Sequence, residues 1–379
     1  MAIGRYLSVK VPESCRSHCK FICQTRSLPT YTSHDRKSGT TLAQSQITCT
    51  MAPNTGSSQV ANEHVAQKIE DKDKAATRTE YTREFVWTNV IVHTVLHIAC
   101  IYSILFVSWK CQWYTLLFAF VLGWLSNLGI TAGAHRLWSH KSYSAKLPLR
   151  IFLAIIACLS CQNSIYIWCR DHRVHHKFTE TDGDPHNAKR GFFFSHMGWL
   201  WVKKHPDVIK NGAKLDFSDL MNDPVVYYQH KFYYPLILMI SFVLPTVVPY
   251  FLWNESLWNA YFVAAVMRLV LTLNITWCVN SAAHMWGYHP YDETIEPAEN
   301  IAVSFFALGE GWHNYHHVFP FDYRAAELPW KVNPTTQFID LMHLIGQAYG
   351  LKYMSKEAIR SRATKYGDGT IYPRGDKTN

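Results

Sequence analysis

The chain has 379 residues, of which 48% are apolar and 15% aromatic, and it carries a net charge of +9. This mixture is richer in apolar and aromatic residues than a typical soluble enzyme, so it indicates a membrane protein with a large polar part. No nucleic-acid-binding motif accompanies the positive charge. The charge therefore favours attraction to anionic headgroups or to a phosphorylated ligand over binding of nucleic acid.

Residues 1–80 are polar, rich in Ser, Thr, Lys and Arg, and lack hydrophobic periodicity, so they are predicted to form a disordered tail. No apolar stretch follows Met1, and a cleaved secretory signal is therefore not predicted. Two explanations of the first fifty residues stay open, a transit peptide or an extension ahead of a second start at Met51. Ordered structure is expected over residues 81–349, followed by a polar C-terminal tail, 350–379, that gives no functional signal.

Four apolar segments are long enough to cross a membrane, since about 20 helical residues span about 30 Å of hydrocarbon. Short turns around Trp109–Cys111 and Trp253–Glu255 join them into two helical hairpins, and tryptophans flank both turns, as interfacial aromatics do. The expected fold class is an all-α integral membrane protein whose helical cap holds a histidine-rich site. The predicted spans are 89–109, 113–134, 233–253 and 258–280.

A fifth apolar run, Leu147–Trp168, is interrupted by Gln162 and Asn163. If this run crossed the membrane, the histidines before and after it would face opposite compartments and could not share a site. We therefore predict a helix that lies at the interface or packs within the polar part. Residues 135–231 contain 14 Lys and Arg, whereas the opposite turns carry only Lys110. The positive-inside rule then places both termini and the histidines in the cytosol.

Two copies of one histidine spacing are the strongest chemical signal. His172, His175 and His176 lie at i, i+3 and i+4, which places them on one face of a helix, and His313, His316 and His317 repeat the pattern. Imidazole is a ligand of zinc, copper, nickel and iron. A lone histidine is more often an ordinary polar residue, but the repeat makes that interpretation improbable here.

Two further pairs lie where apolar segments end. His135 and His140 are five residues apart, and in a regular helix they would diverge by about 140°, so the helix is expected to end or distort between them. Asn280 and His284 are one turn apart on a shared face. Nine imidazoles are thus expected at helix ends on one side, and the other eleven histidines are interpreted as surface or structural.

Nine ligands exceed the needs of one ion, because zinc is satisfied by four, so two metals are predicted. Hydrolytic and ferritin-like sites mix carboxylates with histidine, and this chain contains neither an H-E-x-x-H motif nor the pair of E-x-x-H motifs that ferritin-like sites use. An almost purely imidazole pair at the membrane face favours iron, with O₂ attacking an unactivated C–H bond of a lipid.

These segments resemble the three histidine boxes of the membrane acyl-CoA Δ9 desaturases, the stearoyl-CoA desaturase group. The resemblance covers about Glu84 to Tyr349. The motifs that carry it are His135-Arg-Leu-Trp-Ser-His140, Asp171-His-Arg-Val-His-His176, Gly311-Trp-His-Asn-Tyr-His-His317, Gly129-Ile-Thr-Ala-Gly-Ala134, Asp184-Pro-His-Asn187, Gly191-Phe-Phe-Phe-Ser-His196, Asn280-Ser-Ala-Ala-His284 and the continuation to Asp322.

The resemblance implies two iron ions, with O₂ as co-substrate, and the removal of two hydrogens from a saturated acyl chain to leave a cis double bond. It assigns His135, His140, His172, His176 and His316 to one iron, and His175, His284, His313 and His317 to the other, with Asn280 acting through water. Electrons would come from NADH through cytochrome b5 reductase and cytochrome b5. No fused cytochrome b5 motif is present, so the donor would dock in trans on the basic cytosolic face of an endoplasmic reticulum membrane protein.

The resemblance also implies the substrate contacts. Positions matching contacts to the coenzyme A part are Asn89, Asn163, Arg170, Asp171, Lys203 and Lys204. Positions matching the bend of the acyl tunnel are Gln162, Trp168, Thr276 and Trp277. Taken alone, Lys203 and Lys204 would be a solvated charge pair near headgroups, and the two tryptophans would be packing residues or interfacial anchors.

Gly123 and Asn127 match the far end of the tunnel, where mammalian members carry Tyr and Ala. Glycine opens room and asparagine fills some, so the preferred chain length stays open, as does Δ9 against neighbouring positions. Two rivals are also left open. One is another histidine-box oxygenase, such as a lipid hydroxylase, and the other is a zinc-bearing membrane receptor or hydrolase.

Overall fold

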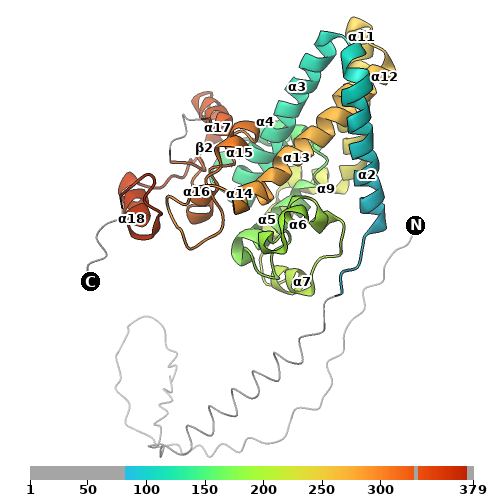
Figure 1. Cartoon of the computed structure of the whole chain (residues 1–379). Helices are drawn as coiled ribbons and strands as arrows, with labels where there is room; N and C mark the ends of the chain where they lie inside the picture. Colours follow the sequence, from blue (N-terminus) through green and yellow to red (C-terminus); the bar gives the residue numbers. More distant parts are fainter. Residues whose placement is uncertain (1–81, 328–331, 374–379) are drawn as a thin grey trace, which may run out of the picture. The chain divides into compact units, whose positions relative to one another are not determined.

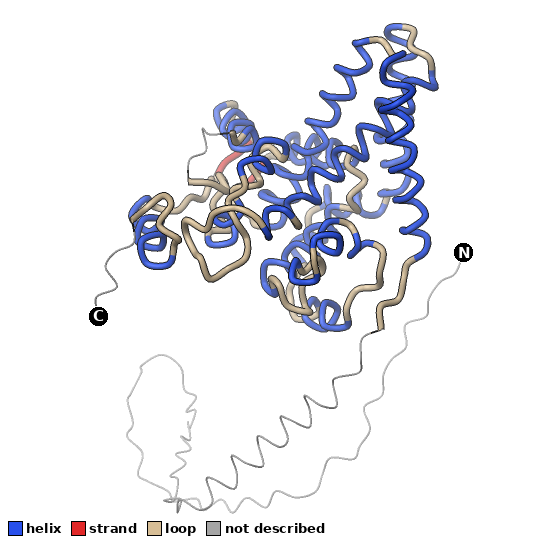
Figure 2. Tube along the Cα trace, in the orientation of Figure 1, coloured by secondary structure: helices blue, strands red, loops and turns tan. Residues whose placement is uncertain are grey.

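The computed structural model describes residues 82–327 and 332–373, and these lie in one unit, 76–379. The predicted tail, 1–80, lies outside the described residues. Almost all the regular structure is helical (Figures 1 and 2), and the strands among the described residues are β1, Ser144–Ala145, and β2, Ala348–Tyr349, which pair antiparallel.

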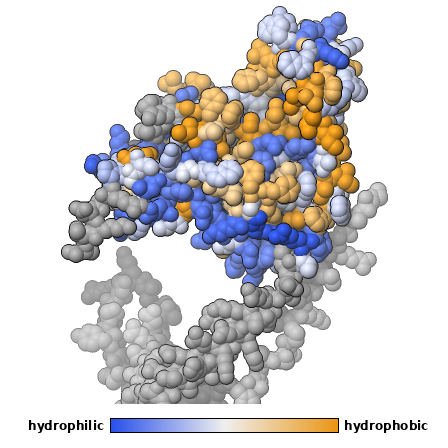
Figure 3. All heavy atoms as spheres, in the orientation of Figure 1, coloured by the Kyte–Doolittle hydropathy of each residue, from blue (hydrophilic) through white to orange (hydrophobic). Residues whose placement is uncertain are grey.

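Four helices of the described chain are long and apolar enough to cross a membrane, and they coincide with the four predicted spans. The third has the predicted bounds, and the other three run somewhat further than predicted, because their helices continue beyond the apolar stretches. In Figure 3 apolar residues cover the part of the molecule formed by these helices, and hydrophilic residues gather below it. The helices are Trp87–Lys110, Trp113–Ser139, Tyr233–Trp253 and Leu257–Met285.

Every span contains a π-helical stretch, in which the backbone bonds run from i to i+5 and widen the turn. Such stretches occur frequently at functional sites. The first span comprises α2 (Trp87–Tyr102), η1 (Ser103–Val107) and η2 (Ser108–Lys110), and the second comprises α3 (Trp113–Leu128) and η3 (Gly129–Ser139). The third span comprises α10 (Tyr233–Ile237), η6 (Leu238–Val243) and α11 (Leu244–Trp253). The fourth span comprises α12 (Leu257–Ala260), η7 (Tyr261–Met267), α13 (Arg268–Asn280) and α14 (Ala282–Met285).

A buried carboxylate joins the two hairpins at the end remote from the histidines. Glu255 lies in the turn between the third and fourth spans, and it accepts hydrogen bonds from the Gln112 N–H at 2.7 Å and the Thr115 hydroxyl at 2.8 Å. The indole N–H of Trp253 donates to the same hydroxyl at 2.9 Å. The two predicted hairpin turns are short, and these hydrogen bonds also link them to each other.

The run Leu147–Trp168 forms two helices where one was predicted. α4, Leu147–Cys158, is too short to span, and α5, Ile165–Phe178, begins after a link in which Cys161 and Asn163 have φ of +51° and +69°. Ile151 and Ile155 of α4 are exposed, while Leu149 and Leu153 are buried. One face of α4 is thus free to contact lipid, as the interfacial interpretation expects.

The remaining helices cap the bundle on the side where the histidines lie. The C-terminal part, which carries no functional motif, includes α18, whose Ile359 and Ala363 pack against Tyr315 and Phe319 next to the third histidine box. The helices are η4, Ala188–Arg190, α6, Phe192–His196, η5, Gly198–Leu200, α7, Pro206–Gly212, α8, Ser218–Asn222, α9, Pro224–Lys231, α15, Ile301–Phe306, α16, His313–Val318, α17, Pro334–Leu344, and α18, Lys356–Tyr366.

Candidate metal centre

The first histidine pair is brought together by the π-helical end of the second span. The N–H of His140 donates to the carbonyl of His135 at 3.1 Å, which is the i to i+5 bond of a π-helix. The two rings then lie 4.9 Å apart between centroids, whereas in an α-helix they would diverge. The expected distortion between His135 and His140 is confirmed, and it begins at Gly129, earlier than predicted.

The second box lies on α5, and its non-histidine positions fix the helix in place. Ser164 caps the N-terminus by accepting from the N–H of Ile167. Arg173 donates to the carbonyl oxygens of Trp138 at 2.7 Å and Ser139 at 3.0 Å, so it caps the end of η3 beside His140. Its other partner is Asp219, at 2.7 Å. The x positions of H-x-x-H-H thereby join the second box to the first.

The third box lies on α16, and its x positions are again structural. The buried Asn314 side chain accepts from the N–H of Tyr291 and donates to the carbonyl of Pro297, both at 2.9 Å. The Tyr315 hydroxyl donates to Asp322 at 2.7 Å. Gly311 is required just before the helix, because a Cβ there would lie 2.2 Å from the Ser304 nitrogen.

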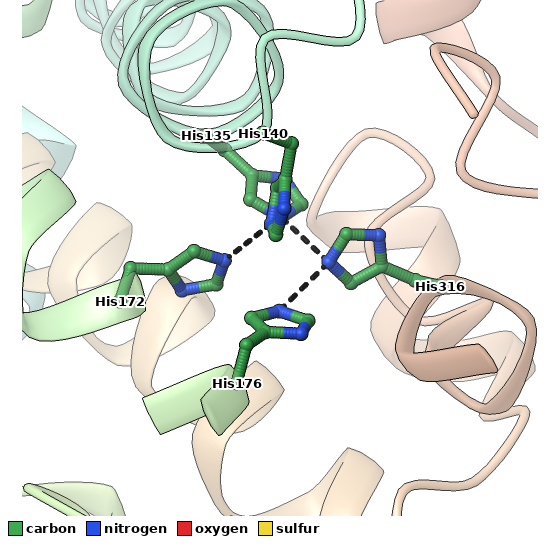
Figure 4. A group of neighbouring side chains, drawn as sticks. All are labelled: His135, His140, His172, His176 and His316. Atoms are coloured by element: carbon green, nitrogen blue, oxygen red, sulfur yellow. Dashed lines mark hydrogen bonds between the residues drawn. The ribbon is translucent and has the colours of Figure 1, made fainter. Parts of the chain in front are cut away.

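Five imidazoles from these elements converge on one point (Figure 4). The Nε2 atoms of His135 and His316 are 2.9 Å apart, and those of His316 and His176 are 3.0 Å apart. The Nε2 atoms of His140 and His172 are 2.8 Å apart. We call His135, His140, His172, His176 and His316 the five-histidine group.

Four imidazoles form a second convergence. The Nε2 atom of His313 lies 3.0 Å from that of His284 and 3.1 Å from that of His317. The His175 ring lies 5.0 Å from that of His284 between centroids. We call His175, His284, His313 and His317 the four-histidine group. The structure thus brings the nine histidines into the two sets that the resemblance implied.

Three buried carboxylates hold the outer nitrogens of the rings. Nδ1 of His135 lies 2.7 Å from Glu310, Nδ1 of His175 lies 2.9 Å from Asp184, and Nδ1 of His284 lies 2.8 Å from Glu180. Because a carboxylate accepts a hydrogen bond, each Nδ1 carries the proton and each Nε2 lone pair is directed inward. Such partners orient histidine ligands and make them more basic.

Sequence reasoning did not assign these carboxylates. Asp184 was noticed only as part of a motif, and Glu180 and Glu310 were not singled out, although Glu310 lies three residues before His313. His186, interpreted as surface or structural, is buried with its ring 4.2 Å from that of His175. A polar residue close in sequence to a histidine box was the available signal for all four.

The donor set fits two metal ions. Burial, followed by repulsion from neighbouring histidines, lowers the pKa of His140, His172, His176, His313, His316 and His317 well below the ordinary value, so these imidazoles are neutral and offer lone pairs. Nitrogens that each lie about 2 Å from one ion are about 3 Å apart, as the Nε2 atoms are here. Two metal ions, one in each group, would satisfy the nine rings.

A small cavity, about 40 Å³, lies against both groups. His135 and His172 of one group and His175 and His313 of the other line it, together with Asn280 and Asn127. Asn280, predicted to act through water, therefore lies at the space that both groups share. Asn127 is buried and also lines this space, and its place at the tunnel end remains a prediction.

The residues expected at the tunnel bend surround a larger cavity, about 400 Å³. The Gln162 amide donates to the Thr276 hydroxyl at 2.9 Å, and its carbonyl accepts from the Trp168 indole at 3.3 Å. Trp277, His172 and Asn280 belong to the same lining, so this cavity reaches the histidines. The four bend residues lie together, as the resemblance implied.

The residues expected to contact coenzyme A divide into two sets. Asn89, Asn163 and Asp171 line the larger cavity, and Asp171 is also part of a neighbouring cavity, about 390 Å³, with Arg170 and Lys204. Both cations pair with Asp171, at 3.0 Å and 2.5 Å. Lys203 lies apart from this cluster, and its exposed ammonium is 2.5 Å from Glu84.

Gly123 lies in a contact between α3 and α13. A Cβ placed on it would be 3.3 Å from Thr272 and 3.6 Å from Arg268. Glycine at such a position lets two membrane helices approach closely. The described cavities are not lined by Gly123, so its predicted place at the tunnel end remains a prediction.

The fold and site define a class of protein: a mostly helical membrane protein whose four spans are capped by helices that hold two clustered groups of histidines able to bind metal. A sequence model of the fatty acid desaturase family matches residues 112–339. The chain belongs to this family.

Named relatives cover most of the chain. Stearoyl-CoA desaturase 5 of Bos taurus is 54% identical over 290 residues, which are 76% of this chain and 86% of that protein. Acyl-CoA Delta-9 desaturase of Acheta domesticus is 52% identical, over 79% of this chain and 84% of that protein. Acyl-CoA desaturase of Cyprinus carpio is 57% identical, over 75% of this chain and 87% of that protein.

Proposed function

We propose that the chain is an acyl-CoA Δ9 desaturase that holds one iron ion in each histidine group. The observation that carries the proposal is the cavity of about 400 Å³ that extends from Asp171 to His172 and Asn280, together with the neighbouring cavity of about 390 Å³ in which Arg170 and Lys204 flank the same Asp171. Cations at one end suit the phosphates of coenzyme A, and an apolar passage that ends at the metal ligands suits a long acyl chain. The names of the relatives support the same substrate class.

The reaction removes one hydrogen from each of two neighbouring methylene groups. One acyl chain, one O₂, two electrons and two protons give one cis alkene and two waters, so atoms and charge balance. Iron would supply the activation of O₂ that an unactivated C–H bond requires. The protein supplies the neutral nitrogen ligands, the carboxylates that orient them and a passage for the acyl chain.

The chain's own residues position the substrate in this scheme. Gln162, held between Thr276 and Trp168, forms a rigid bend in the passage, and Trp277 forms the wall beside it. Lys204 supports a role at the phosphates: burial lowers the pKa of its ammonium although Asp171 opposes that effect, so a second anion would stabilise its charge. Lys203, exposed beside Glu84, would contact only the outer part of coenzyme A.

The electron donor in this proposal is cytochrome b5, reduced by NADH through its reductase and acting in trans. The Lys and Arg residues of 135–231 suit an acidic partner by charge complementarity, and by the positive-inside rule they orient the histidine side to the cytosol. The membrane proposed is that of the endoplasmic reticulum. The proposed ordered domain is residues 81–349. Helix α18 lies beyond this range and packs against it.

Expression of the full chain in yeast that lacks its own desaturase tests the function. Growth without added unsaturated fatty acid, and a cis double bond at C9 of the recovered acyl chains, is the expected result. An alcohol in place of the alkene would favour the hydroxylase, and a double bond at another carbon would correct the regiochemistry. Catalysis sustained by zinc, without O₂ or reductant, would exclude the oxidative proposal.

A further inference from the structure

Three histidines that do not belong to either metal group surround one indole ring. His93 and His97 lie on α2, His196 lies on α6, and the ring they surround is that of Trp277 on α13. The centroid distances to this indole are 5.6 Å, 6.1 Å and 5.7 Å. His97 stacks on the ring, and the other two meet it edge-on. A buried tryptophan is thus enclosed by polar rings from two other elements.

The donor and the acceptor of each hydrogen bond can be assigned at the α2 end of this cluster. Nδ1 of His97 lies 2.7 Å from the carbonyl of His93, and because a carbonyl only accepts, Nδ1 carries the proton. Nε2 of His97 is then an acceptor, and it receives the amide N–H of Asn274 at 3.1 Å. The same Asn274 nitrogen donates to the carbonyl of Val270 at 2.8 Å, which fixes the orientation of the amide.

The cluster continues from Asn274 to the end of α13. With its nitrogen so oriented, the Asn274 oxygen accepts from Nε2 of His196 at 3.1 Å. Nδ1 of His196 lies 2.9 Å from the hydroxyl of Ser281, the residue that follows Asn280. His97, Asn274 and His196, which we call the indole network, therefore connect the first span to the helix end beside the metal centre.

The indole network does not itself reach the substrate passage. Trp277, Thr276, Asn280 and His93 line the cavity of about 400 Å³, whereas the three members of the network do not. They act on the passage through the Trp277 ring, which is 3% exposed. Polar side chains are rare on spanning helices and usually mark function, and His97 lies on a helix whose neighbours Val95 and Ile98 are exposed and apolar.

We propose that His97, Asn274 and His196 are positioning residues that fix the Trp277 indole and thereby determine which acyl C–C bond lies at the metals. This inference rests on the proposed function. A passage with a fixed wall holds the chain in one register, and a register error of one methylene is discriminated by about 10–200-fold in a well-defined apolar pocket. A ring free to tilt would relax this discrimination and spread the double bond over neighbouring carbons.

The test compares matched substitutions in the yeast assay. His97→Leu and Asn274→Leu remove the bond between α2 and α13, whereas His97→Gln keeps an acceptor for the Asn274 amide. Val95→Ala, on the exposed face of α2, is the control. The measurements are the distribution of double-bond positions and the iron content of the purified chain. We expect the leucine variants to lower the ratio of C9 product to neighbouring products about tenfold, His97→Gln to restore most of it, and iron content to stay constant.

A double-mutant cycle tests whether the effect passes through the indole. Trp277→Phe should produce the same redistribution, and His97→Leu combined with Trp277→Phe should add little, because both remove one constraint. If the leucine variants do not accumulate in the membrane, Asn274→Asp tests the same bond, since a carboxylate cannot donate to His97.

Less product with an unchanged distribution would overturn the inference, and so would effects that add in the double variant. A wild-type chain that makes no double bond would instead be a failure of the proposed function, so the two failures are distinguishable.

Discussion

The two histidine groups differ in what surrounds them more than in the rings themselves. In the five-histidine group one ring meets a carboxylate, Glu310, and that carboxylate is also paired with the buried Arg136 at 2.8 Å. In the four-histidine group two rings meet Asp184 and Glu180, and no arginine or lysine within the described residues pairs with either. The five-histidine group therefore has more nitrogens, and the charge of its one carboxylate is neutralised by Arg136. The four-histidine group has fewer nitrogens and two carboxylates that no such cation of the described chain neutralises.

This difference indicates distinct tasks for the carboxylates. Asp184 and Glu180 are available to stabilise the charge of an ion in the four-histidine group. Burial alone would raise the pKa of Asp184, but its contacts with His175 outweigh burial and lower it, so it stays ionised. Glu310 connects His135 to Arg136, which also donates to the carbonyl of Tyr323 at 2.9 Å. The first two carboxylates are thus placed to act on an ion in the four-histidine group, and the third also links separate elements of the fold.

The largest effects are expected from loss of one ligand in each group. His172→Ala and His317→Ala should each abolish the alkene, because the proposed reaction uses an ion in each group, and each should remove one of the two proposed irons while membrane insertion persists. Iron content and product are measured on the same preparations, with His343→Ala as control, since His343 bonds to the Ala348 carbonyl away from the centre. Product formation by either group variant would show that one ion suffices.

Removing one carboxylate charge should separate the two tasks. Glu310→Gln leaves Arg136 without its partner, and breaking a buried ion pair costs about 3–5 kcal/mol of unfolding free energy. Asp184→Asn leaves no such cation, so we expect a loss of metal affinity, about 10–100-fold, with little change in the stability of the metal-free chain. Denaturation of chelator-treated protein and iron titration give the two values. Equal losses of unfolding free energy in Glu310→Gln and Asp184→Asn would contradict the proposed difference between the two carboxylates.

Acid should weaken both groups together. The six imidazoles with lowered pKa stay neutral in the folded chain, whereas in the unfolded chain they bind protons near pH 6.5. Below that pH the unfolded chain therefore binds more protons than the folded chain. The folded chain is thus more stable above about pH 6.5 and loses stability as the pH falls. The melting temperature of metal-free protein in detergent should decrease between about pH 7.5 and about pH 5.5. A flat or opposite profile would mean that the rings are charged when folded.

The smallest effect concerns the remote end of the passage. Gly123→Tyr should shorten the preferred acyl chain, because the added ring would occupy room at the predicted tunnel end. To fit between α3 and α13, the ring would also have to displace Thr272 and the Arg268 stem. Chain lengths of the unsaturated products measure this, with Gly123→Ala as the milder comparison. An unchanged profile, at normal expression, would place the end of the passage elsewhere.

The parts of the molecule that repeat or run long in the sequence could be predicted. The four spans follow from apolar length, and His172, His176, His313 and His317 follow from a spacing that one helix face explains. The sequence shows an interruption of Leu147–Trp168 at Gln162 and Asn163 but does not predict two separate helices, because Cys161 and Asn163 adopt positive φ without being glycine. A sequence does not show such strain when tertiary contacts impose it.

Residues whose role depends on a distant partner could not be predicted from spacing. Glu180 contacts His284, 104 residues further along the chain, and Arg136 contacts Glu310, 174 residues further along. His97 and His196 were interpreted as surface or structural because neither belongs to a repeat. Only the fold places Asn274 between them.

The packing of α18 against α16 has a consequence for how the enzyme matures. The helix that carries His313, His316 and His317 is covered on its other side by Ile359 and Ala363, which are made later than every ligand. A ribosome-bound chain that has exposed all nine histidines still lacks this cover. Iron loading should therefore follow synthesis of residues 356–366, and chains shortened before them would enter the membrane yet fail to retain metal.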